Sequence, residues 1–271
     1  MFNIFQYGFI VRGIEVGIVI GVIAPLIGTF LILRRYALIA DALAHVSLAG
    51  VALGLLLGLN PLISAIGTAV ASSVAVERLR ISKRVYADSA LSIFLSGSLA
   101  LAIVLISIAK GFSVDLFNYL FGSIVTVKTS DLYVILILGI VVILSVLAFY
   151  KELIYITFDE EAAQVSGINT RLINMILIVL TAFTVSLAIP IVGILLIAAL
   201  VVIPVVTAIQ LKKNFLATVI YAEIISVLSV IIGIIGSFYF NVPAGGAIVL
   251  LTIIIFVLVF WYKSAVYKGK K

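Results

Sequence analysis

ADALAHVSLAG, at residues 40–50, is an apolar sequence that contains one carboxylate and one imidazole. These groups belong to Asp41 and to His45, the single histidine of the chain, and a longer apolar run surrounds both. Positions four apart share one face of an α-helix, so the two side chains point the same way. In lipid, both groups are costly to bury unless a partner satisfies them. The pair is therefore a candidate functional site, and we expect its partner to be a divalent metal ion.

The composition of the chain is that of a membrane protein. Hydrophobic residues make up 65% and charged residues only 10%, whereas soluble domains contain roughly 25% charged residues. Apolar runs recur from end to end, each long enough to cross a hydrocarbon layer of about 30 Å as a helix. The chain has no cysteine, which excludes thiolate metal sites and disulfides. We therefore expect an all-α, polytopic transmembrane bundle that forms one domain over residues 1–271.

The apolar runs predict about nine membrane spans. They lie at residues 13–33, 38–58, 61–79, 90–109, 131–149, 172–190, 192–211, 215–238 and 244–262. Eight spans are also possible, because residues 172–211 fit either two short crossings that turn near Pro190 or one crossing and a re-entrant segment. Pro190 and Pro204 each remove a backbone hydrogen bond and are expected to act as hinges or as fixed kinks.

Basic residues predict the orientation, because they concentrate in the cytoplasmic loops of membrane proteins. With the amino terminus outside and the carboxyl terminus in the cytoplasm, 14 of the 17 basic residues fall in inside loops. These are Arg34, Arg35, Arg78, Arg80, Lys83, Arg84, Lys151, Arg171, Lys212, Lys213, Lys263, Lys268, Lys270 and Lys271. The net charge of +6 thus reflects topology, with the lipid bilayer and no nucleic acid as partner. We expect a prokaryotic cell membrane, or the inner membrane of a two-membrane bacterium, with no cleaved signal peptide.

The largest inside loop, at residues 150–171, predicts a short helix. Thr157 or Asp159 can cap its start, acidic residues fill its first turn, and Gly167 can end it. Two turns are not stable alone, so packing on this chain or on a partner must hold the helix. On the outside, residues 110–130 are expected to form a short interfacial helix, as either a structured vestibule or a plain loop.

Several other ionisable groups are further candidates. Glu223 lies near mid-membrane, where it either lines a pathway or pairs with another helix. Asp115 lies outside, as part of an entrance or as an ordinary helix cap. Glu77 and Asp88 flank a basic inside loop and are expected to be surface partners of its cations. The alternative for His45 is a packing histidine bonded to a backbone carbonyl.

A series of segments occurs in a characteristic order along nearly the whole chain. They are LRR at 33–35, DALAH at 41–45, ERLR at 77–80, DSA at 88–90, DLFNYLFGS at 115–123, FDEEAA at 158–163 followed by Gly167, GILL at 193–196, Ile203-Pro204, and VPAGGA at 242–247. Together they resemble the permease subunit of ABC importers of the zinc, manganese and iron type.

The resemblance implies partners and a docking element. Such permeases work as homodimers with cytoplasmic ATP-binding subunits and an extracellular or periplasmic metal-binding protein, which decides the metal. A Glu-Ala-Ala segment with a glycine four residues later forms a coupling helix that docks on the ATPase. Here it would lie at about 158–167, with Asp159, Glu160, Glu161, Ala162, Ala163 and Gly167. Alone, such a triplet would more often be a chance sequence in a surface helix.

Two further inferences complete the sequence-based hypothesis. The chain has no Gly-x-x-x-x-Gly-Lys-Ser/Thr phosphate loop, so it is not expected to be an enzyme, and a separate subunit must hydrolyse ATP. Two ligands are too few for an ion, but a two-fold axis would bring Asp41 and His45 together with their symmetry mates as a tetrahedral set of four. That set suits transported Zn²⁺ or Mn²⁺ and tolerates Fe²⁺, with no permanent cofactor.

Two rival functions remain. An ion-gradient-driven secondary carrier would need no ATPase, and copurification with an ATPase distinguishes it. An intramembrane metalloenzyme is disfavoured, because a catalytic zinc site usually takes three protein ligands.

Overall fold

The computed structural model describes residues 6–82, 86–108 and 114–268. Within these ranges the regular structure is entirely helical, with no strand. The prediction of an all-α bundle is therefore confirmed.

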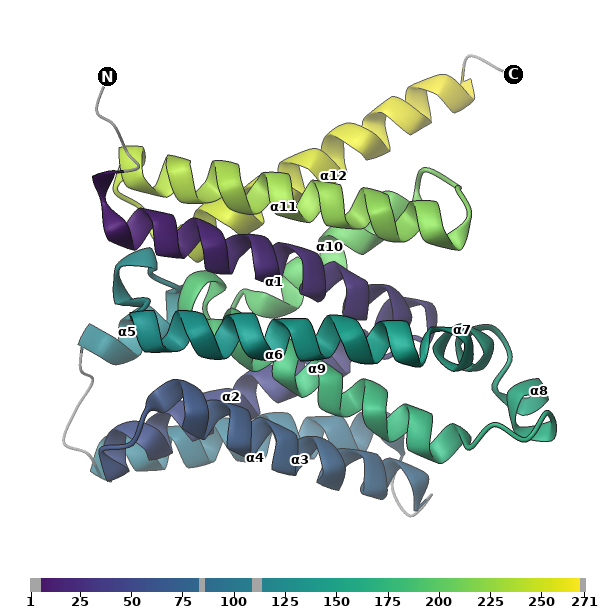
Figure 1. The fold of residues 1–271 in the computed structure, drawn as a ribbon, viewed down its shortest axis with the longest axis horizontal. Helices are drawn as coiled ribbons and strands as arrows, with labels where there is room; N and C mark the ends of the chain where they lie inside the picture. Colours follow the sequence, from purple (N-terminus) through teal and green to yellow (C-terminus); the bar gives the residue numbers. More distant parts are fainter. Residues whose placement is uncertain (1–5, 83–85, 109–113, 269–271) are drawn as a thin grey trace.

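The long helices run beside one another along the long axis of the molecule (Figure 1). In chain order the elements are α1 (Gly8–Leu33), α2 (Ala37–Leu57), α3 (Pro61–Ile81), α4 (Ala87–Ile108), α5 (Val114–Phe121), the 3-10 turn η2 (Ile124–Thr126), α6 (Thr129–Ala148), α7 (Tyr150–Phe158), α8 (Glu160–Val165), α9 (Thr170–Val192), α10 (Ile197–Ile209), α11 (Phe215–Phe240) and α12 (Ala244–Lys268). Among the described helices, eight are long and apolar enough to cross a membrane: α1, α2, α3, α4, α6, α9, α11 and α12.

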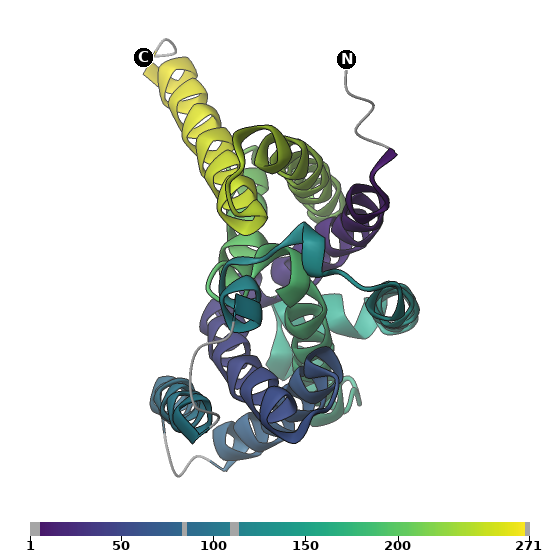
Figure 2. The same ribbon diagram turned by 90° about the vertical axis from the view of Figure 1, so that its left-hand side faces the viewer.

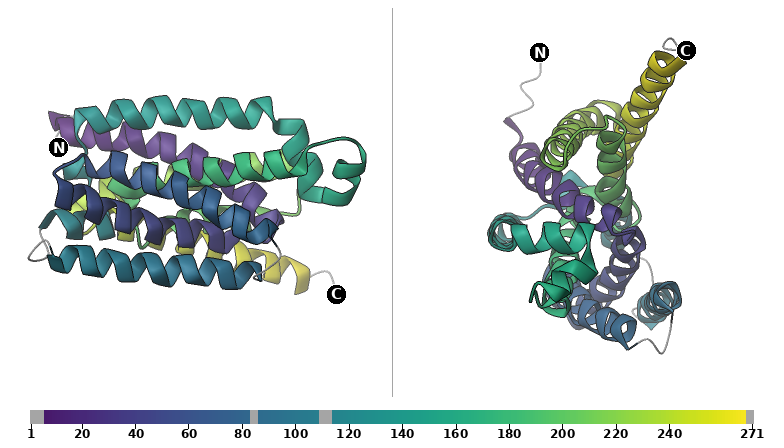
Figure 3. Two further views of the ribbon diagram at one scale, coloured as in Figure 1. Left: turned by 90° about the horizontal axis from the view of Figure 1, so that it is seen from below. Right: turned by 90° about the vertical axis from the view of Figure 1, so that its right-hand side faces the viewer.

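Three helices, α1, α2 and α9, form the centre of the bundle. Most of their residues are buried, and α9 runs obliquely among the others and contacts α1, α2, α3 and α6. A helix that is apolar on every side is stable only where it is covered on every side. By contrast, α4 and α6 stand at the edges of the bundle (Figure 2), and α12 leaves it towards its carboxyl end (Figure 3).

The region predicted as two crossings or a re-entrant segment contains one long helix and one short helix. Helix α9 continues through Pro190 to Val192, so the chain does not turn at Pro190 as one alternative required. The break falls at Gly193, whose φ of 83° and ψ of 153° suit glycine alone. Helix α10 has 13 residues and is about 20 Å long, less than the ~30 Å of a hydrocarbon layer. In place of the predicted span at 192–211 there is only the short helix α10. The preceding helix α9 continues past Pro190 and ends at Gly193, so fewer residues remain for α10.

The break between α9 and α10 is covered by the segment that contains α5. The backbone N–H of Ile194 donates to the carbonyl of Tyr119 at 3.0 Å, and that of Ser123 donates to the carbonyl of Pro190 at 2.9 Å. The predicted short helix in residues 110–130 is therefore present as α5, and backbone hydrogen bonds fix it to the core. Residues 109–113 lie outside the described part of the chain.

Three glycines allow this contact to be made backbone to backbone. A Cβ atom on Gly122 would lie 2.1 Å from the carbonyl oxygen of Ile191, and one on Gly245, at the start of α12, would lie 1.9 Å from that of Val192. A Cβ on Gly193 would lie 2.5 Å from the nearest backbone atoms of the α5 segment. The end of α9, the α5 segment and the start of α12 meet only because side chains are missing there.

We predict that Gly193→Ala destabilises the protein. The substitution forces a residue with a side chain to φ of 83° and into contact with backbone that cannot move, so we expect a loss of about 2 kcal/mol and a fall in melting temperature of roughly 4–8 °C. Gly67→Ala on α3 is the control, because a Cβ there meets no atom within 4 Å. Thermal unfolding in detergent measures both; equal melting temperatures would contradict the close approach.

Candidate metal-ion site and docking helix

Asp41 and His45 lie on one face of α2, as their spacing predicts. Nε2 of His45 is 3.9 Å from Oδ1 of Asp41, too far for a hydrogen bond. Two ligands of a tetrahedral ion with bonds of ~2.1 Å lie about 3.4 Å apart, so a small rotation of either side chain would place both at ligand distance. The Asp41 side chain is 40% exposed and that of His45 16%. The pair thus opens to the surface of the single chain and is not enclosed by it.

The second ring nitrogen of His45 is not satisfied within the described part of the chain. Nδ1 is buried and has no hydrogen-bond partner there. The alternative of a packing histidine required a bond to a backbone carbonyl, and the described residues provide none. A buried polar atom without a partner costs about 1–3 kcal/mol, which is more readily explained at a binding site than in a packing contact.

The opposite side of α2 is held tightly by its neighbours. Ser47 Oγ lies 3.1 Å from Ser186 Oγ on α9 and donates to the Leu43 carbonyl at 2.9 Å. A Cβ on Gly50 would lie 2.0 Å from Thr68 Oγ1 on α3. Close packing on this side fixes the direction in which Asp41 and His45 face.

No other ionisable residue in the described ranges completes a ligand set. Among them, no three His, Asp or Glu residues come together closely enough to hold a metal ion. Glu223 is half-buried on α11, which packs on α1, α10 and α12, so the structure does not bring it to the pair. Asp115 lies in the first turn of α5, but its side chain is outside the described part of the structure. One chain therefore offers two ligands.

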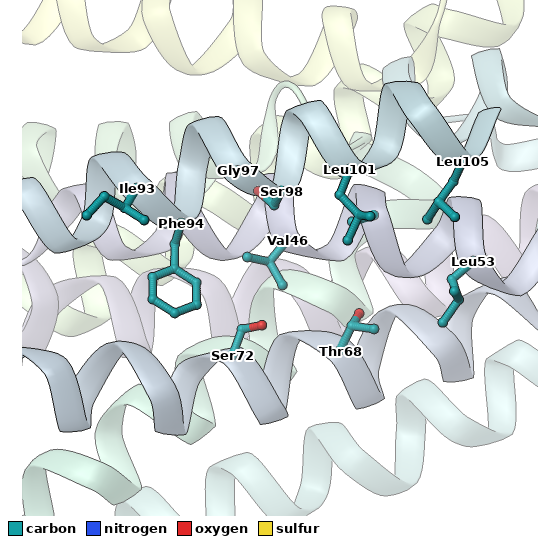
Figure 4. A pocket seen from close by; sticks show the side chains of 11 residues that line it. Val46, Leu53, Thr68, Ser72, Ile93, Phe94, Gly97, Ser98, Leu101 and Leu105 are labelled. Atoms are coloured by element: carbon teal, nitrogen blue, oxygen red, sulfur yellow. The ribbon is translucent and has the colours of Figure 1, made fainter. Parts of the chain in front are cut away.

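A cavity of about 350 Å³ lies between α2, α3 and α4, and neither Asp41 nor His45 lines it. Phe94 and Leu101 of α4 point into it towards Val46 of α2 (Figure 4). Its polar atoms are a few hydroxyls, of which Thr68 and Ser98 already donate to carbonyls of their own helices. The cavity lacks charged side chains and is not itself a cation site.

The predicted inside-loop helix is present as α8, and α7 precedes it. Asp159 Oδ1 accepts from the N–H of Ala162 at 2.8 Å, so Asp159 is the N-cap. Thr157, the other predicted cap, instead donates to a carbonyl within α7. Gly167 ends the helix at φ of 87°, with hydrogen bonds from Gly167 N and Ile168 N back into the last turn. The two helices project from one end of the bundle (Figure 3).

An ionic contact holds α8 against the rest of the chain. Arg34, at the end of α1, donates to Glu160 Oε2 at 2.7 Å and also to the Asn174 amide oxygen. Asn174, on α9, donates to Glu160 Oε1 at 2.8 Å. Three elements distant in sequence therefore meet at the first residue of α8.

Glu77 differs from its predicted surface position. Its side chain is fully buried, and both carboxylate oxygens accept from Arg80, each at 2.7 Å. The pairing with a cation of the basic loop was expected, but burial was not. The bidentate geometry supplies the charge-assisted bonds that a buried carboxylate needs. Asp88, by contrast, is exposed as expected.

Comparison with known proteins decides the family. Residues 6–263 match the profile of the ABC 3 transport family. The chain belongs to this family. It is therefore a multi-pass membrane protein and an ABC transporter permease, a non-enzymatic subunit.

Relatives and a solved structure match this permease over almost its whole length. The manganese transport system membrane protein MntC of Listeria innocua is 35% identical over 96% of this chain and 92% of the relative. The high-affinity zinc uptake system membrane protein ZnuB of Haemophilus influenzae is 36% identical over 89% of this chain and 93% of the relative. The structure of PsaBC from Streptococcus pneumoniae in complex with Fab has a TM-score of 0.85 and 31% identity, covering 95% of this chain and 93% of that one.

Sequence reasoning on this permease did not identify the contacts around α8. Arg34 was predicted only as an inside-loop cation and as part of the LRR segment, and no role was predicted for Asn174. Arg34 and Glu160 are 126 positions apart, and no local pattern predicts such a pair. The single available signal was an arginine at a helix end with no carboxylate near it in sequence.

We predict that Asp159→Ala loosens α8. Losing the side-chain cap costs about 1 kcal/mol, which corresponds to roughly fivefold faster amide exchange in residues 160–165. Asp159→Asn is the matched control, since asparagine caps equally well. Hydrogen exchange with mass spectrometry measures both; equal protection in all three proteins would show that the cap does not stabilise α8.

Proposed function

We propose that this chain is the permease subunit of an ATP-driven importer of Mn²⁺ or Zn²⁺, and that Asp41 and His45 bind the ion on its way through the membrane. The single observation that carries the proposal is this pair, a carboxylate and an imidazole 3.9 Å apart on a central helix of an ABC 3 family chain. The named transport of manganese and zinc by relatives supports the choice of ions.

The ligands themselves suit a transported ion. A carboxylate oxygen and an imidazole nitrogen bind Zn²⁺ well and accept Mn²⁺ and Fe²⁺. Fixed ligands replace part of the hydration shell that the ion loses in the membrane. The site must also release its ion, so an open pair of ligands serves transport better than a closed cage would.

A homodimer would complete the site. Asp41 and His45 open to the surface of the single chain, and Nδ1 of His45 is unsatisfied in the described structure. A two-fold axis beside α2 would place four ligands around one ion. It would also offer the imidazole the additional contacts that metal-bound histidines usually make.

The two ends of the bundle suit two different partners. Helices α7 and α8 project from the end where Arg34, Arg80 and Arg171 also lie, so this end is proposed to be cytoplasmic. There, α8 would dock on the ATP-binding subunit through its exposed residues, such as Val165 at 90% exposure. At the opposite end, near α5, an extracellular or periplasmic metal-binding protein would deliver the ion.

ATP would drive the transport by alternating access. Movement of the ATPases would displace α8, and the helices of each protomer would respond by opening the Asp41/His45 site to one side and then to the other. The separate subunit would hydrolyse ATP.

We expect His45→Ala and Asp41→Ala to lower ATP-dependent uptake of ⁵⁴Mn or ⁶⁵Zn into vesicles by at least about tenfold, because each removes a ligand. The vesicles hold the permease, its ATPase and external binding protein. Asp88→Asn is the control, since Asp88 is an exposed carboxylate that does not form a ligand cluster with the pair. Copurification of the ATPase with every variant confirms that the complex is intact. Unchanged uptake in both alanine variants would remove the pair from the ion path, and uptake without any ATPase would indicate a secondary carrier.

Glu223→Gln separates the remaining candidate from the pair. Because α11 does not bring Glu223 to Asp41 and His45, we expect uptake to change by less than about twofold, within the range of an ordinary helix-packing change. The same vesicle assay measures this variant. A loss as large as that of His45→Ala would place a second ion contact on α11.

A further inference from the structure

Tyr36 occupies the junction between the helix that carries the ion ligands and the ionic contact that holds α8. It is the residue immediately before α2, five positions before Asp41 and nine before His45. Along a helix, nine residues correspond to about 14 Å. A displacement of Tyr36 therefore moves the amino-terminal end of α2, the helix that carries Asp41 and His45.

Two arginines from different elements lie over the ring of Tyr36. The guanidinium carbon of Arg34 is 4.8 Å from the ring centroid, and that of Arg80, near the end of α3, is 4.6 Å from it. Arg80 also donates a hydrogen bond to the Tyr36 hydroxyl. Each cation–π contact contributes about 0.5–2 kcal/mol, depending on how dry it is.

Each arginine is anchored by its own carboxylate. Arg34 is 4% exposed and is bound by Glu160 of α8, whereas Arg80 is bound by the buried Glu77 of α3. The contacts form one continuous chain from Glu160 through Arg34, Tyr36 and Arg80 to Glu77. Its α3 end is buried and fixed, while Glu160, at 43% exposure, is the accessible end.

The turn between α1 and α2 is too short to absorb a displacement. It consists of Arg34, Arg35 and Tyr36, with Arg35 at φ of 61°. The N–H of Tyr36 donates to the Leu31 carbonyl at 2.7 Å, and that of Arg35 donates to the Ile32 carbonyl at 3.0 Å. These are the two hydrogen bonds of a tight helix stop. Arg34 and Tyr36 thus move together.

We propose that Tyr36 is a positioning residue for transport, which passes displacement of α8 to α2 through Arg34 while Arg80, held by Glu77, anchors its ring and hydroxyl to α3. The inference rests on the proposed function, because it assumes that an ATPase moves α8. Planar guanidinium groups can slide over an aromatic face without losing contact. The contact between these groups and the ring therefore allows α2 to shift during transport. It also favours the return of α2 to its original position afterwards.

The test compares Tyr36→Leu with Tyr36→Phe in the assembled complex of permease, ATPase and binding protein. ATP hydrolysis and Mn²⁺ uptake are measured in the same vesicles. Removing the ring should raise the ATP hydrolysed per Mn²⁺ transported about fivefold, with the KM for Mn²⁺ changed less than about twofold. Tyr36→Phe keeps the ring and should restore most of the coupling. Tyr262→Leu is the control, because Tyr262 is 68% exposed on α12.

The ratio of ATP hydrolysed to Mn²⁺ transported distinguishes a loss of coupling from damage to the fold. A smaller amount of intact complex would lower uptake and hydrolysis together and leave this ratio unchanged. If Tyr36→Leu does not assemble, Arg34→Lys gives the same test, because it keeps a charge opposite Glu160 but loses the planar group over the ring. If the assembled variant hydrolyses the same amount of ATP per Mn²⁺ as the wild type, the role of Tyr36 is overturned, while the proposed function stands. Absence of ATP-dependent uptake by the wild type overturns the proposed function and this inference with it.

A label provides a second readout that does not require metal transport. The chain has no cysteine, so Leu38→Cys, on the exposed first turn of α2, introduces one thiol for a fluorophore. Addition of ATP to the complex should shift its emission, and Tyr36→Leu should abolish the shift. The same shift in both backgrounds would show that α2 moves without Tyr36.

Discussion

In a hydrocarbon layer every backbone N–H and C=O must find its partner within the protein, and the helices and their connections are arranged accordingly. The eight long helices satisfy this constraint along most of their length through their own backbone hydrogen bonds. The break between α9 and α10 does not, and there the α5 segment accepts hydrogen bonds from Ile194 and Leu195 and donates one to Pro190. Glycines at 122, 193 and 245 allow the backbones to come close enough. The outer segment is thus part of the core structure and not an appended loop.

Charged groups in the bundle obey the same rule in different ways. Glu77 is satisfied fully by a bidentate bond to Arg80, and Glu160 by Arg34 and Asn174. Asp41 and His45 are not satisfied to this degree, since 3.9 Å separates their nearest atoms. Groups that hold the structure together are paired within the chain. The pair proposed to meet an ion is left with unused ligand capacity.

The satisfied charges lie at one end of the bundle and the unsatisfied pair lies within it, on a helix that joins both. Helix α2 directly follows Tyr36, which contacts two arginines, and carries Asp41 and His45. The same helix packs closely on α3 and α9. This arrangement connects α8 to the proposed ion ligands through elements that are individually stiff, as a transporter driven by an ATPase at one end would require.

Features that depend on local periodicity and composition could be predicted from the sequence. It predicted the long helices, the shared face of Asp41 and His45, two candidate caps for α8 at Thr157 and Asp159, and the stop at Gly167, because each follows from residues within a few positions of one another. The short length of α10, the burial of Glu77 and the pairing of Arg34 with Glu160 follow from the packing of the helices. These depend on how far backbones can approach and on which side chains meet across more than a hundred residues. No local sequence pattern predicts how closely the backbones approach or which distant side chains meet, because these contacts form only when the helices are packed.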